Sequence, residues 1–331
     1  MSKILSIAVP SYNVEKYLHK CLDSFSDDRL KEGLEVLIVN DGSTDSTEEI
    51  AKSYVAKYPE IFRLINKENG GHGSAVNAGI ANATGKYFRV VDGDDWVVTE
   101  HMPKLLDILA SADTDLVVDE KSDVHMITGE RTYIPLPESV EPMKVYDFED
   151  VCMKEGVAPY LILHTLTAKT ELLRKYDIKL LEHIFYVDYE YIVKTTCRSK
   201  SIMFVQLEIY QYLIGNVNQS VDSQNYVRRY EHHDKVVKEL LRYAKENVFE
   251  GVLQEYLDTR IMLVIHSHYK ISLIFDKDRS QGLSRGKNFY HYLKTNYPKY
   301  AKMTKKRYWI TLACHFARVD AQKLDKIMGR K

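Results

Sequence analysis

Three aspartates, Asp92, Asp94 and Asp95, lie within four positions of one another in the segment VVDGDDWVV, residues 90–98. They follow directly after an apolar run that is typical of a buried strand. Like charges this close repel one another, so the cluster needs a physical reason. A surface turn is one interpretation, because Asp and Gly are ordinary turn formers. The other is a bound cation, whose positive charge would offset the repulsion between the carboxylates.

Three other polar or glycine-rich loops follow apolar runs in the first hundred residues. They read PSYN at 10–13, NDGSTD at 40–45 and ENGGHG at 68–73. In parallel α/β sheets, ligands bind in the crevice beyond the carboxyl ends of the strands. We therefore expect all four loops to meet in one site.

Hydrophobic periodicity predicts the elements that must position these loops. Strands are expected at 4–9, 34–40, 62–68 and 86–95, and helices at 13–25, 45–58 and 73–83. Such alternation predicts an α/β fold with a mostly parallel, Rossmann-like central sheet and helices on both faces. From about residue 222 the pattern is helical only. We expect one domain over 1–220 and a helical C-terminal region over 221–331.

The composition is that of an ordinary folded protein, with 45% hydrophobic and 28% charged residues among 331. No apolar run approaches the ~20 residues of a membrane span, and the first apolar stretch, ILSIAVP, is too short for a signal-peptide core. A cytoplasmic location is expected. The four cysteines form no CxxC pair, so free, mostly buried thiols are expected rather than a zinc site or disulfides.

Three classes of nucleotide-binding protein do not fit the motifs. A dehydrogenase would carry GxGxxG in the first strand-to-helix turn, which here reads VPSYNVEKY and has no glycine. A P-loop is excluded because GxxxxGK[ST] does not occur. A sugar nucleotidyltransferase would need a glycine-rich, arginine-bearing first loop, which is also absent.

Four ordered segments carry a family resemblance: IAVPSYNVEKYLHKCLDSF, VLIVNDGSTDSTEEIA, NGGHGSAVNAGIANATGKYFRVVDGDDWV and FYVDYEYI. They resemble the inverting glycosyltransferases of family 2, which have the GT-A fold. The resemblance implies transfer of a sugar from a nucleotide-sugar donor, most simply a UDP-sugar, by single displacement. The acceptor would be a hydroxyl group of a growing glycan, a lipid-linked saccharide, a glycolipid or a glycoprotein. No nucleic-acid partner is expected.

The resemblance also implies roles for individual residues. Asp95 is expected to touch the metal, Mn²⁺ or Mg²⁺, most directly, while Asp94 helps it or holds the ribose and Asp92 supports both from the strand end. Asp41 is expected to accept a hydrogen bond from the uracil N–H. We also expect Asp95 to be a surface carboxylate. Nucleotide-sugar contacts are expected from Pro10, Tyr12, Asn13, Asp41, Ser43, Gly71, His72, Asn77, Asp92 and Asp94.

Several of these residues also have structural interpretations. Ser43, Thr44 or Asp45 would cap the following helix, with Asp45 the favoured cap. Tyr12 and Asn13 would simply form a turn, and His72 would be structural. The family often has an arginine before Asn77, where this chain has Val76; His72, Ser74 or Asn77 would then substitute for the lost contact.

The catalytic base implied by the resemblance is Asp188, in FYVDYEYIVK, which would take the proton of the acceptor hydroxyl. The alternative is a helix N-cap. Many relatives have Glu where this chain has Val187, and the next candidate, Glu190, is expected to be exposed on a helix. Val76 and Val187 leave a second hypothesis open, a nucleotide-sugar-binding or scaffold protein without turnover.

The later parts of the chain give weaker predictions. Lys169 and Arg174 are expected as acceptor-side polar contacts, and Asn218, Gln219 and Ser220 as a loop that closes the site or simply turns. Residues 299–331 are strongly basic, while the rest of the chain is net negative. Trp309, Ile310, Leu312 and Phe316 beside these charges predict either peripheral contact with the inner face of the cell membrane or a helix docked on its own protein.

Overall fold

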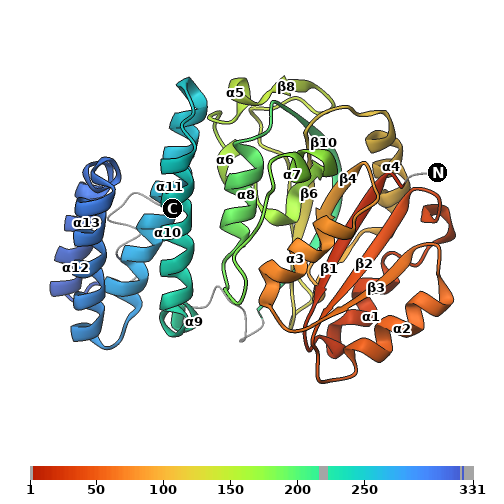
Figure 1. Ribbon diagram of the computed structural model, residues 1–331, viewed down its shortest axis with the longest axis horizontal. Coiled ribbons are helices and arrows are strands. Elements are labelled where there is room, and N and C mark those ends of the chain that lie inside the picture. The colour runs from red at the N-terminus through yellow and green to blue at the C-terminus, as the bar shows by residue number, and fades with distance from the viewer. Residues whose placement is uncertain (1–2, 216–222, 321–322, 324–331) are drawn as a thin grey trace. The chain divides into compact units, whose positions relative to one another are not determined.

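The computed structural model describes residues 3–215, 223–320 and 323 of the chain. The chain divides into two compact units, Met1–Asn216 and Val217–Lys331 (Figure 1). The first unit contains a sheet with helices, and the described part of the second contains helices alone. The assignment of separate functional domains to 1–220 and 221–331 stays a prediction.

Ten strands form one sheet in the order β3-β2-β1-β4-β9-β6-β10-β5, with β7 paired to β6 and β8 paired to β10. The strands β1 to β4 run parallel to one another, whereas β9 lies antiparallel between β4 and β6. Their bounds are β1 (Leu5–Ser11), β2 (Leu34–Asp41), β3 (Phe62–Lys67), β4 (Tyr87–Val90), β5 (Trp96–Val97), β6 (Leu116–His125), β7 (Arg131–Ile134), β8 (Val145–Asp147), β9 (Leu166–Lys169) and β10 (Ser201–Ile214).

Eight α-helices accompany this sheet in the described part of the first unit, and Figure 1 shows them around it. They are α1 (Glu15–Asp23), α2 (Thr47–Lys57), α3 (Gly71–Asn82), α4 (Met102–Ser111), α5 (Phe148–Val151), α6 (Val157–Tyr160), α7 (Thr170–Lys175) and α8 (Asp188–Thr196). The strands and helices predicted for the first hundred residues are all present. The mixed α/β fold with helices on both faces is therefore confirmed.

The two faces of the sheet are covered by different helices. Alternate residues of β1, such as Leu5, Ile7 and Val9, belong to a core that includes side chains of α1, α2 and α4. On the other face α3 packs directly against β1 and β2. A Cβ at Gly79 of α3 would lie only 2.5 Å from the Ala8 Cβ, so glycine permits this close approach. Because β1 is buried along its whole length, it reads as a continuous apolar run rather than an alternating one.

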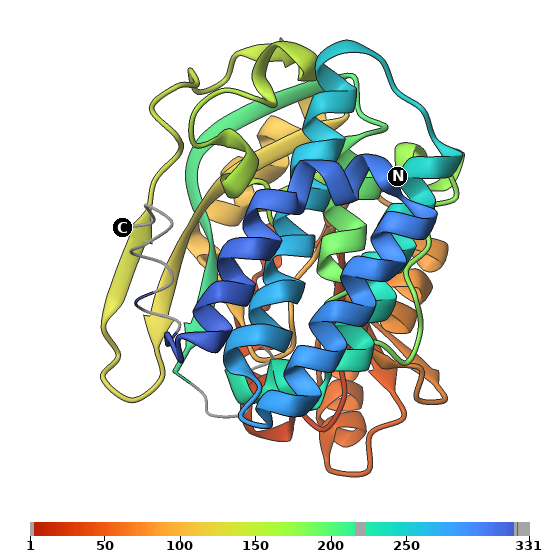
Figure 2. The ribbon, with the colours of Figure 1, turned by 90° about the vertical axis from the view of Figure 1, so that its left-hand side faces the viewer.

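The second unit is a bundle of helices, as the pattern beyond residue 222 predicts (Figure 2). Its helices are α9 (Ser223–Arg228), α10 (Tyr230–Glu246), α11 (Gly251–Lys270), α12 (Arg279–Asn296) and α13 (Pro298–Phe316), and a π-helical turn, Ile271–Phe275, follows α11. The helix α13 packs against α11 and α12. Over the described ranges, no helix is both long enough and apolar enough to cross a bilayer.

Candidate active site

The loops after β1 and β2 are joined to each other by hydrogen bonds between side chains and backbone. The N–H of Asn13 donates to Ser43 Oγ at 3.1 Å. The Asp45 carboxylate accepts from the N–H groups of Glu15, at 3.2 Å, and Thr47, at 3.0 Å, which are the first residues of α1 and α2. Asp45 therefore satisfies N–H groups at the starts of both helices, but the N-cap position of α2 belongs to Ser46, one residue later than the capping interpretation predicted. Asn13 and Ser43 fix the shape of the paired loops, and their contact with a donor stays a prediction.

Asp41 connects the end of β2 to the start of α3. It is buried, and its Oδ1 accepts hydrogen bonds from Lys67 Nζ at 2.7 Å and from the Gly70 N–H at 2.9 Å. Its Oδ2 accepts from the Gly71 N–H at 2.7 Å. Gly71 has φ of 81°, in the left-handed region that glycine adopts without strain. Asp41 and Gly71 thus shape the glycine-rich loop, and their contact with a nucleotide stays a prediction.

The loop after β1 presents an aromatic side chain at the rim of the sheet. Pro10 is buried within β1, whereas Tyr12 is 51% exposed. An exposed tyrosine has an apolar face on which a nucleobase can stack. The expectation that Pro10 and Tyr12 form a wall of the base site remains a prediction.

The three aspartates differ in their exposure. Asp92 and Asp94 are half-buried, whereas Asp95 is 1% exposed. The Asp95 carboxylate accepts hydrogen bonds from Tyr210 Oη at 2.5 Å and from the Leu213 N–H at 2.7 Å. The expectation that Asp95 is a surface carboxylate is therefore wrong, because β10 covers it.

The crowding of the three carboxylates shifts their pKa values. Burial and the neighbouring Asp92 carboxylate raise the pKa of Asp94 to about 6. Burial, Asp94 and Asp92 together hold the pKa of Asp95 well above its usual range. Burial would also raise the pKa of Asp92, but the facing His72 outweighs it and lowers that pKa. A bound cation would relieve the repulsion that these shifts express.

His72 pairs with one carboxylate of this group. Its Nε2 lies 2.8 Å from Asp92 Oδ1. Burial alone would lower the pKa of His72, but Asp92 outweighs burial, Asp188 and Asp94 add to the effect, and the net pKa is raised. His72 is thus an ion-pair partner of Asp92 within the site, and its contact with a donor stays a prediction.

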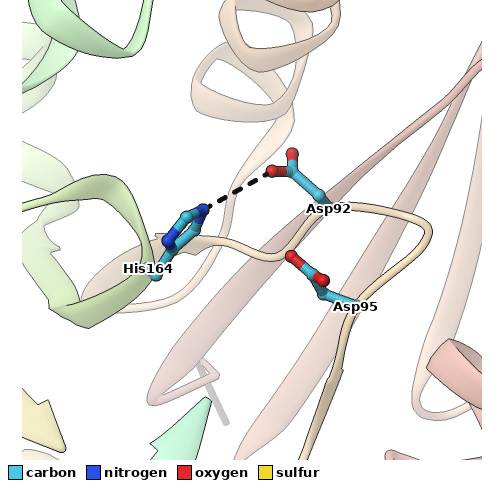
Figure 3. A group of neighbouring side chains, drawn as sticks. All are labelled: Asp92, Asp95 and His164. Atoms are coloured by element: carbon cyan, nitrogen blue, oxygen red, sulfur yellow. Dashed lines mark ion pairs between the residues drawn. The ribbon is translucent and has the colours of Figure 1, made fainter. Parts of the chain in front are cut away.

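His164 lies at the same place, although the sequence analysis did not single it out. One ligand atom each of Asp92, Asp95 and His164 lies within 4.8 Å of the others (Figure 3). The His164 Nε2 is 4.0 Å from Asp92 Oδ2. Burial lowers the pKa of His164 to about 4, so its imidazole is neutral at pH 7. A lone histidine 69 positions from the last aspartate gives no signal in the sequence, because only the packing of the 3-10 turn Leu163–Thr165 before β9 brings it here.

Asp188 approaches the same charges from α8. Val187 occupies the N-cap position of this helix and Asp188 is its first residue, so the N-cap alternative does not hold. The Asp188 side chain is solvent-accessible, but the surrounding protein raises the pKa of its carboxyl. His72 opposes this rise in pKa and Asp92 adds to it, which places Asp188 within electrostatic reach of both.

Glu190, the second candidate for the base, has another role. It is fully buried, and its Oε2 lies 3.0 Å from Lys194 Nζ and 3.3 Å from the Leu181 nitrogen. The expected exposure is wrong because α8 is covered on nearly every face. Val187, at the position where many relatives are expected to have Glu, is also buried and packs in the core.

Asn77 is hydrogen-bonded to a segment far along the chain. Its Nδ2 donates to the Leu180 carbonyl at 3.0 Å, and its Oδ1 accepts from the Leu180 N–H at 2.9 Å. This pair ties α3 to the segment that leads to Asp188. The preceding Val76 is fully buried, so the position of the family arginine is filled by a core side chain. A contact between Asn77 and the donor stays a prediction.

The remaining polar candidates are engaged elsewhere or lie outside the described ranges. Lys169 pairs with Asp113 at 2.7 Å. The Arg174 guanidinium donates to carbonyls at the end of α3, including Ala83 at 2.6 Å, and so caps that helix. An acceptor role for either residue stays a prediction. Asn218, Gln219 and Ser220 lie outside the described residues.

The donor set fits a divalent cation. Two carboxylates and an imidazole converge, and the raised pKa values of Asp94 and Asp95 show that negative charge is crowded there. Asp94 lies on the same turn but is not one of the three converging side chains. The expected metal ligands, Asp94 and Asp95, therefore belong to one charged turn, and which of them would touch the ion stays a prediction.

Comparisons with known proteins agree with this geometry. The family model described as Glycosyl transferase family 2 matches residues 6–176. The uncharacterized glycosyltransferase EpsJ of Bacillus subtilis is 38% identical over 139 residues, which make up 41% of this chain and 38% of EpsJ. The aligned part thus covers well under two thirds of that relative.

Two solved structures show the same fold. TarS 1–349 of S. aureus, in complex with UDP-GlcNAc, matches with a TM-score of 0.69 and 20% identity over 99% of this chain and 92% of that chain. The mannosyltransferase PcManGT of Pyrobaculum calidifontis, in complex with GDP-Man and Mn²⁺, matches with a TM-score of 0.53 and 15% identity over 100% of this chain and 89% of that chain.

Proposed function

The chain belongs to glycosyl transferase family 2, and on this premise we propose that it moves a sugar from a UDP-linked donor to a hydroxyl acceptor with inversion at the anomeric carbon. The acceptor is a growing glycan, a lipid-linked saccharide, a glycolipid or a glycoprotein. One observation supports the proposal: Asp92, after β4, and Asp188, in α8, both raise the pKa of His72, so the two carboxylates lie within electrostatic reach of the same imidazole.

The donor side of the site is the aspartate turn. A divalent cation held there by Asp92, Asp94 or Asp95 would supply Lewis-acid stabilisation to the diphosphate leaving group. The UDP-GlcNAc of TarS and the Mn²⁺ of PcManGT support this choice of donor and cofactor, Mn²⁺ or Mg²⁺. His72, whose pKa Asp92 raises, is one substitute for the arginine that the family often has where this chain has Val76.

The acceptor side of the site is the start of α8. Inversion needs one group that removes the proton of the attacking hydroxyl from the face opposite the leaving group. We assign this role to Asp188. Its raised pKa makes the carboxylate a stronger base than a free aspartate, and the nearby His72 keeps that rise in check.

We also propose that α13 brings the protein to anionic membrane lipids. Its exposed side chains include Lys302, Lys305 and Lys306 together with Trp309, which is 52% exposed, and Phe316, which is 63% exposed. Basic side chains beside exposed aromatic rings fit a surface of negative headgroups over acyl chains. Such contact would suit a lipid-linked acceptor.

A donor screen tests the proposed activity. The purified full chain is incubated with UDP-sugars and GDP-sugars in the presence of Mn²⁺. The released nucleoside diphosphate, UDP or GDP, is measured with and without EDTA. We expect release from a UDP-sugar that depends on the cation, and NMR of the product should show the opposite anomeric configuration. Binding of a nucleotide sugar without hydrolysis or transfer to any acceptor tried would instead support a binding protein without turnover.

A further inference from the structure

Arg89 is a fully buried residue of β4, the strand that leads into the aspartate turn. Its guanidinium forms a bidentate pair with the Asp119 carboxylate of β6, in which Nη2 lies 3.0 Å from Oδ1. Nη1 also donates to Thr167 Oγ1 of β9 at 3.2 Å, and Nη2 donates to the backbone carbonyl of His164 at 2.5 Å. One side chain therefore joins β4 to β6, to β9 and to the turn Leu163–Thr165.

The same guanidinium supports the aspartate turn through an aromatic ring. Its Cζ lies 5.8 Å from the centroid of the Tyr210 ring. The Tyr210 hydroxyl accepts a hydrogen bond from the Asp92 N–H at 3.2 Å and donates one to Asp95 Oδ2 at 2.5 Å. Arg89 thus lies against the ring that holds the aspartate turn, and it also binds the backbone of His164, which faces that turn (Figure 3).

The third neighbour of the guanidinium is α8, the helix that begins with Asp188. Tyr191 of α8 is fully buried. Burial raises the pKa of Tyr191 and Arg89 opposes that rise, so the Tyr191 side chain lies within electrostatic reach of the guanidinium. The helix also packs against the turn Leu163–Thr165, whose His164 carbonyl Arg89 binds. Arg89 therefore lies where the elements that carry the aspartate turn, His164 and Asp188 meet.

Stability alone does not account for a charge pair at this place. Burying two charges costs desolvation energy that their attraction seldom repays, and apolar side chains of similar volume often stabilise a core equally well or better. Burial raises the pKa of Asp119 to about 6 although Arg89 opposes the rise, so this part of the core disfavours charge. What arginine provides and an apolar residue does not is a planar fork with fixed hydrogen-bond directions. Such a fork fixes the elements that it joins relative to one another.

We propose that Arg89 and Asp119 are positioning residues of the transfer reaction, which hold the aspartate turn, His164 and the start of α8 in the relative places that transfer requires. This inference rests on the proposed function. Both residues are fully buried, so they act through the elements they join and not by touching a substrate. In an inverting displacement the base and the leaving group lie on opposite faces of one carbon, so a shift of ~1 Å between the elements that carry them can cost ~10²-fold in rate. Donor binding depends less on that alignment, because it needs only one side of the site.

The test replaces both charges at once. In Arg89→Met/Asp119→Leu no buried charge is left unpaired, so the melting temperature should stay close to that of the parent protein. The kcat for release of UDP, measured with the UDP-sugars of the donor screen and Mn²⁺, should fall by ~10–100-fold. The affinity for UDP with Mn²⁺, measured by calorimetry, should change by less than about threefold, because ground-state binding is kept.

The matched control is Arg63→Met/Glu35→Leu, which removes another arginine–carboxylate pair, 3.0 Å long, near the amino-terminal ends of β2 and β3 and so away from the loops of the site. Glu35 also accepts a hydrogen bond from Thr84 Oγ1, so this variant should melt at a lower temperature and keep its kcat. A residue that serves only stability would behave in this second way.

A kcat of the folded Arg89→Met/Asp119→Leu protein within roughly threefold of the parent would overturn the positioning role and leave the proposed function intact. A loss of kcat that disappears on cooling, together with a loss of folded protein, would overturn it as well. If the double variant does not fold, Arg89→Lys decides, because it keeps a positive charge beside Asp119 without the fork and should show the same loss of kcat. A parent protein that turns over none of the donors would overturn the proposed function, and the positioning role with it.

Discussion

At the residue scale, the carboxylates of the site fall into two groups with different surroundings. Asp94 and Asp95 are crowded on one turn, and their raised pKa values show that they favour a positive partner. Asp188 stands on another element and is solvent-accessible. His72 couples the two groups, because it pairs with Asp92 and also interacts with Asp188. This division matches the needs of glycosyl transfer, in which charge develops on the leaving group while a proton leaves the acceptor.

Asp188→Asn tests the role of the base. The amide keeps the shape of the side chain but cannot take a proton, so transfer should fall by ~10²–10⁴-fold while donor affinity persists. Initial rates and calorimetry with UDP and Mn²⁺ would measure the two effects. As a control, Glu190→Gln breaks the ion pair with Lys194 and should mainly lower the melting temperature. If Asp188→Asn transfers within roughly threefold of the parent, a catalytic role for Asp188 is ruled out.

At the element scale, α3 and the segment before α8 act as one structural piece. The Asn77 side chain binds both backbone groups of Leu180, and the His183 N–H donates to the Gly70 carbonyl. His183 and Tyr186 have φ of 58° and 70°, a strained region for residues other than glycine. Contacts with α3 and with Gly70, the residue before it, therefore hold the strained segment 180–186, which leads directly to Asp188.

Asn77→Ala would remove both hydrogen bonds to Leu180. We expect a loss of about 1–3 kcal/mol in the free energy of unfolding, together with a lower kcat, because the segment leading to Asp188 loosens. Asn77→Asp keeps the acceptor for the Leu180 N–H, so its stability and kcat should lie between those of the parent protein and those of Asn77→Ala. Urea unfolding and steady-state kinetics would measure these effects. A higher KM for the donor at unchanged stability would instead favour the predicted contact between Asn77 and the nucleotide sugar.

The helices α10 and α11 contain a buried histidine pair that should make stability depend on pH. His233 Nδ1 lies 3.0 Å from His268 Nδ1, and His268 Nε2 lies 3.3 Å from Asp234 Oδ1. The other carboxylate oxygen of Asp234, Oδ2, pairs with Lys238 Nζ at 2.5 Å. Burial lowers the pKa of both histidines, most strongly that of His233. The folded protein therefore keeps them neutral where the unfolded chain, with pKa near 6.5, already takes up protons.

The stability of this pair should consequently fall as the pH drops below about 6.5, by up to ~1.4 kcal/mol per pH unit for each histidine. Hydrogen exchange of amides in α10 and α11 at pH 7.5 and 5.5 would measure it. His233→Gln should flatten the pH dependence, whereas His19→Gln, at an exposed histidine, should leave it unchanged. Equal pH dependence in all three proteins would show that the pair stays neutral or that its protonation is not linked to unfolding.

At the scale of the whole molecule, the proposed membrane contact is best tested by substitution. Deleting the chain beyond about residue 300 would remove α13, whose Tyr308 and Leu312 are buried, and so expose a core. Charge reversal on its exposed face avoids this problem. We expect the triple change of Lys302, Lys305 and Lys306 to Glu to weaken sedimentation with anionic vesicles, since each basic residue contributes ~1 kcal/mol.

The matched control is the same reversal at three exposed lysines of the first unit, Lys16, Lys57 and Lys104. Their replacement by Glu changes the net charge equally and should affect sedimentation less. Added salt should weaken the binding of the parent protein, because it screens exposed charges. Equal losses in both triple variants would show that only net charge matters, and the specific role of α13 would then be rejected.

The sequence by itself determined the α/β architecture of the first unit. Apolar periodicity is local, so strands and helices can be read from neighbouring residues, and parallel connection places every loop after a strand at the same edge. This reasoning predicted that Asp41, His72 and Asp92 would lie near one another, and it predicted a helical region after residue 222. The family resemblance added the chemistry to those positions.

The tertiary structure alone decided which side chains face one another across long separations. His164 reaches the aspartates through the packing of β9, and Asp95 is buried because Tyr210 and Leu213 of β10 cover it. The Glu190 carboxylate is buried against Lys194 and the Leu181 nitrogen. The Asn77 side chain is hydrogen-bonded to the backbone of Leu180, 103 positions away. Such contacts depend on how distant elements pack and on which polar groups lose water, and neither is encoded in the spacing of residues along the chain.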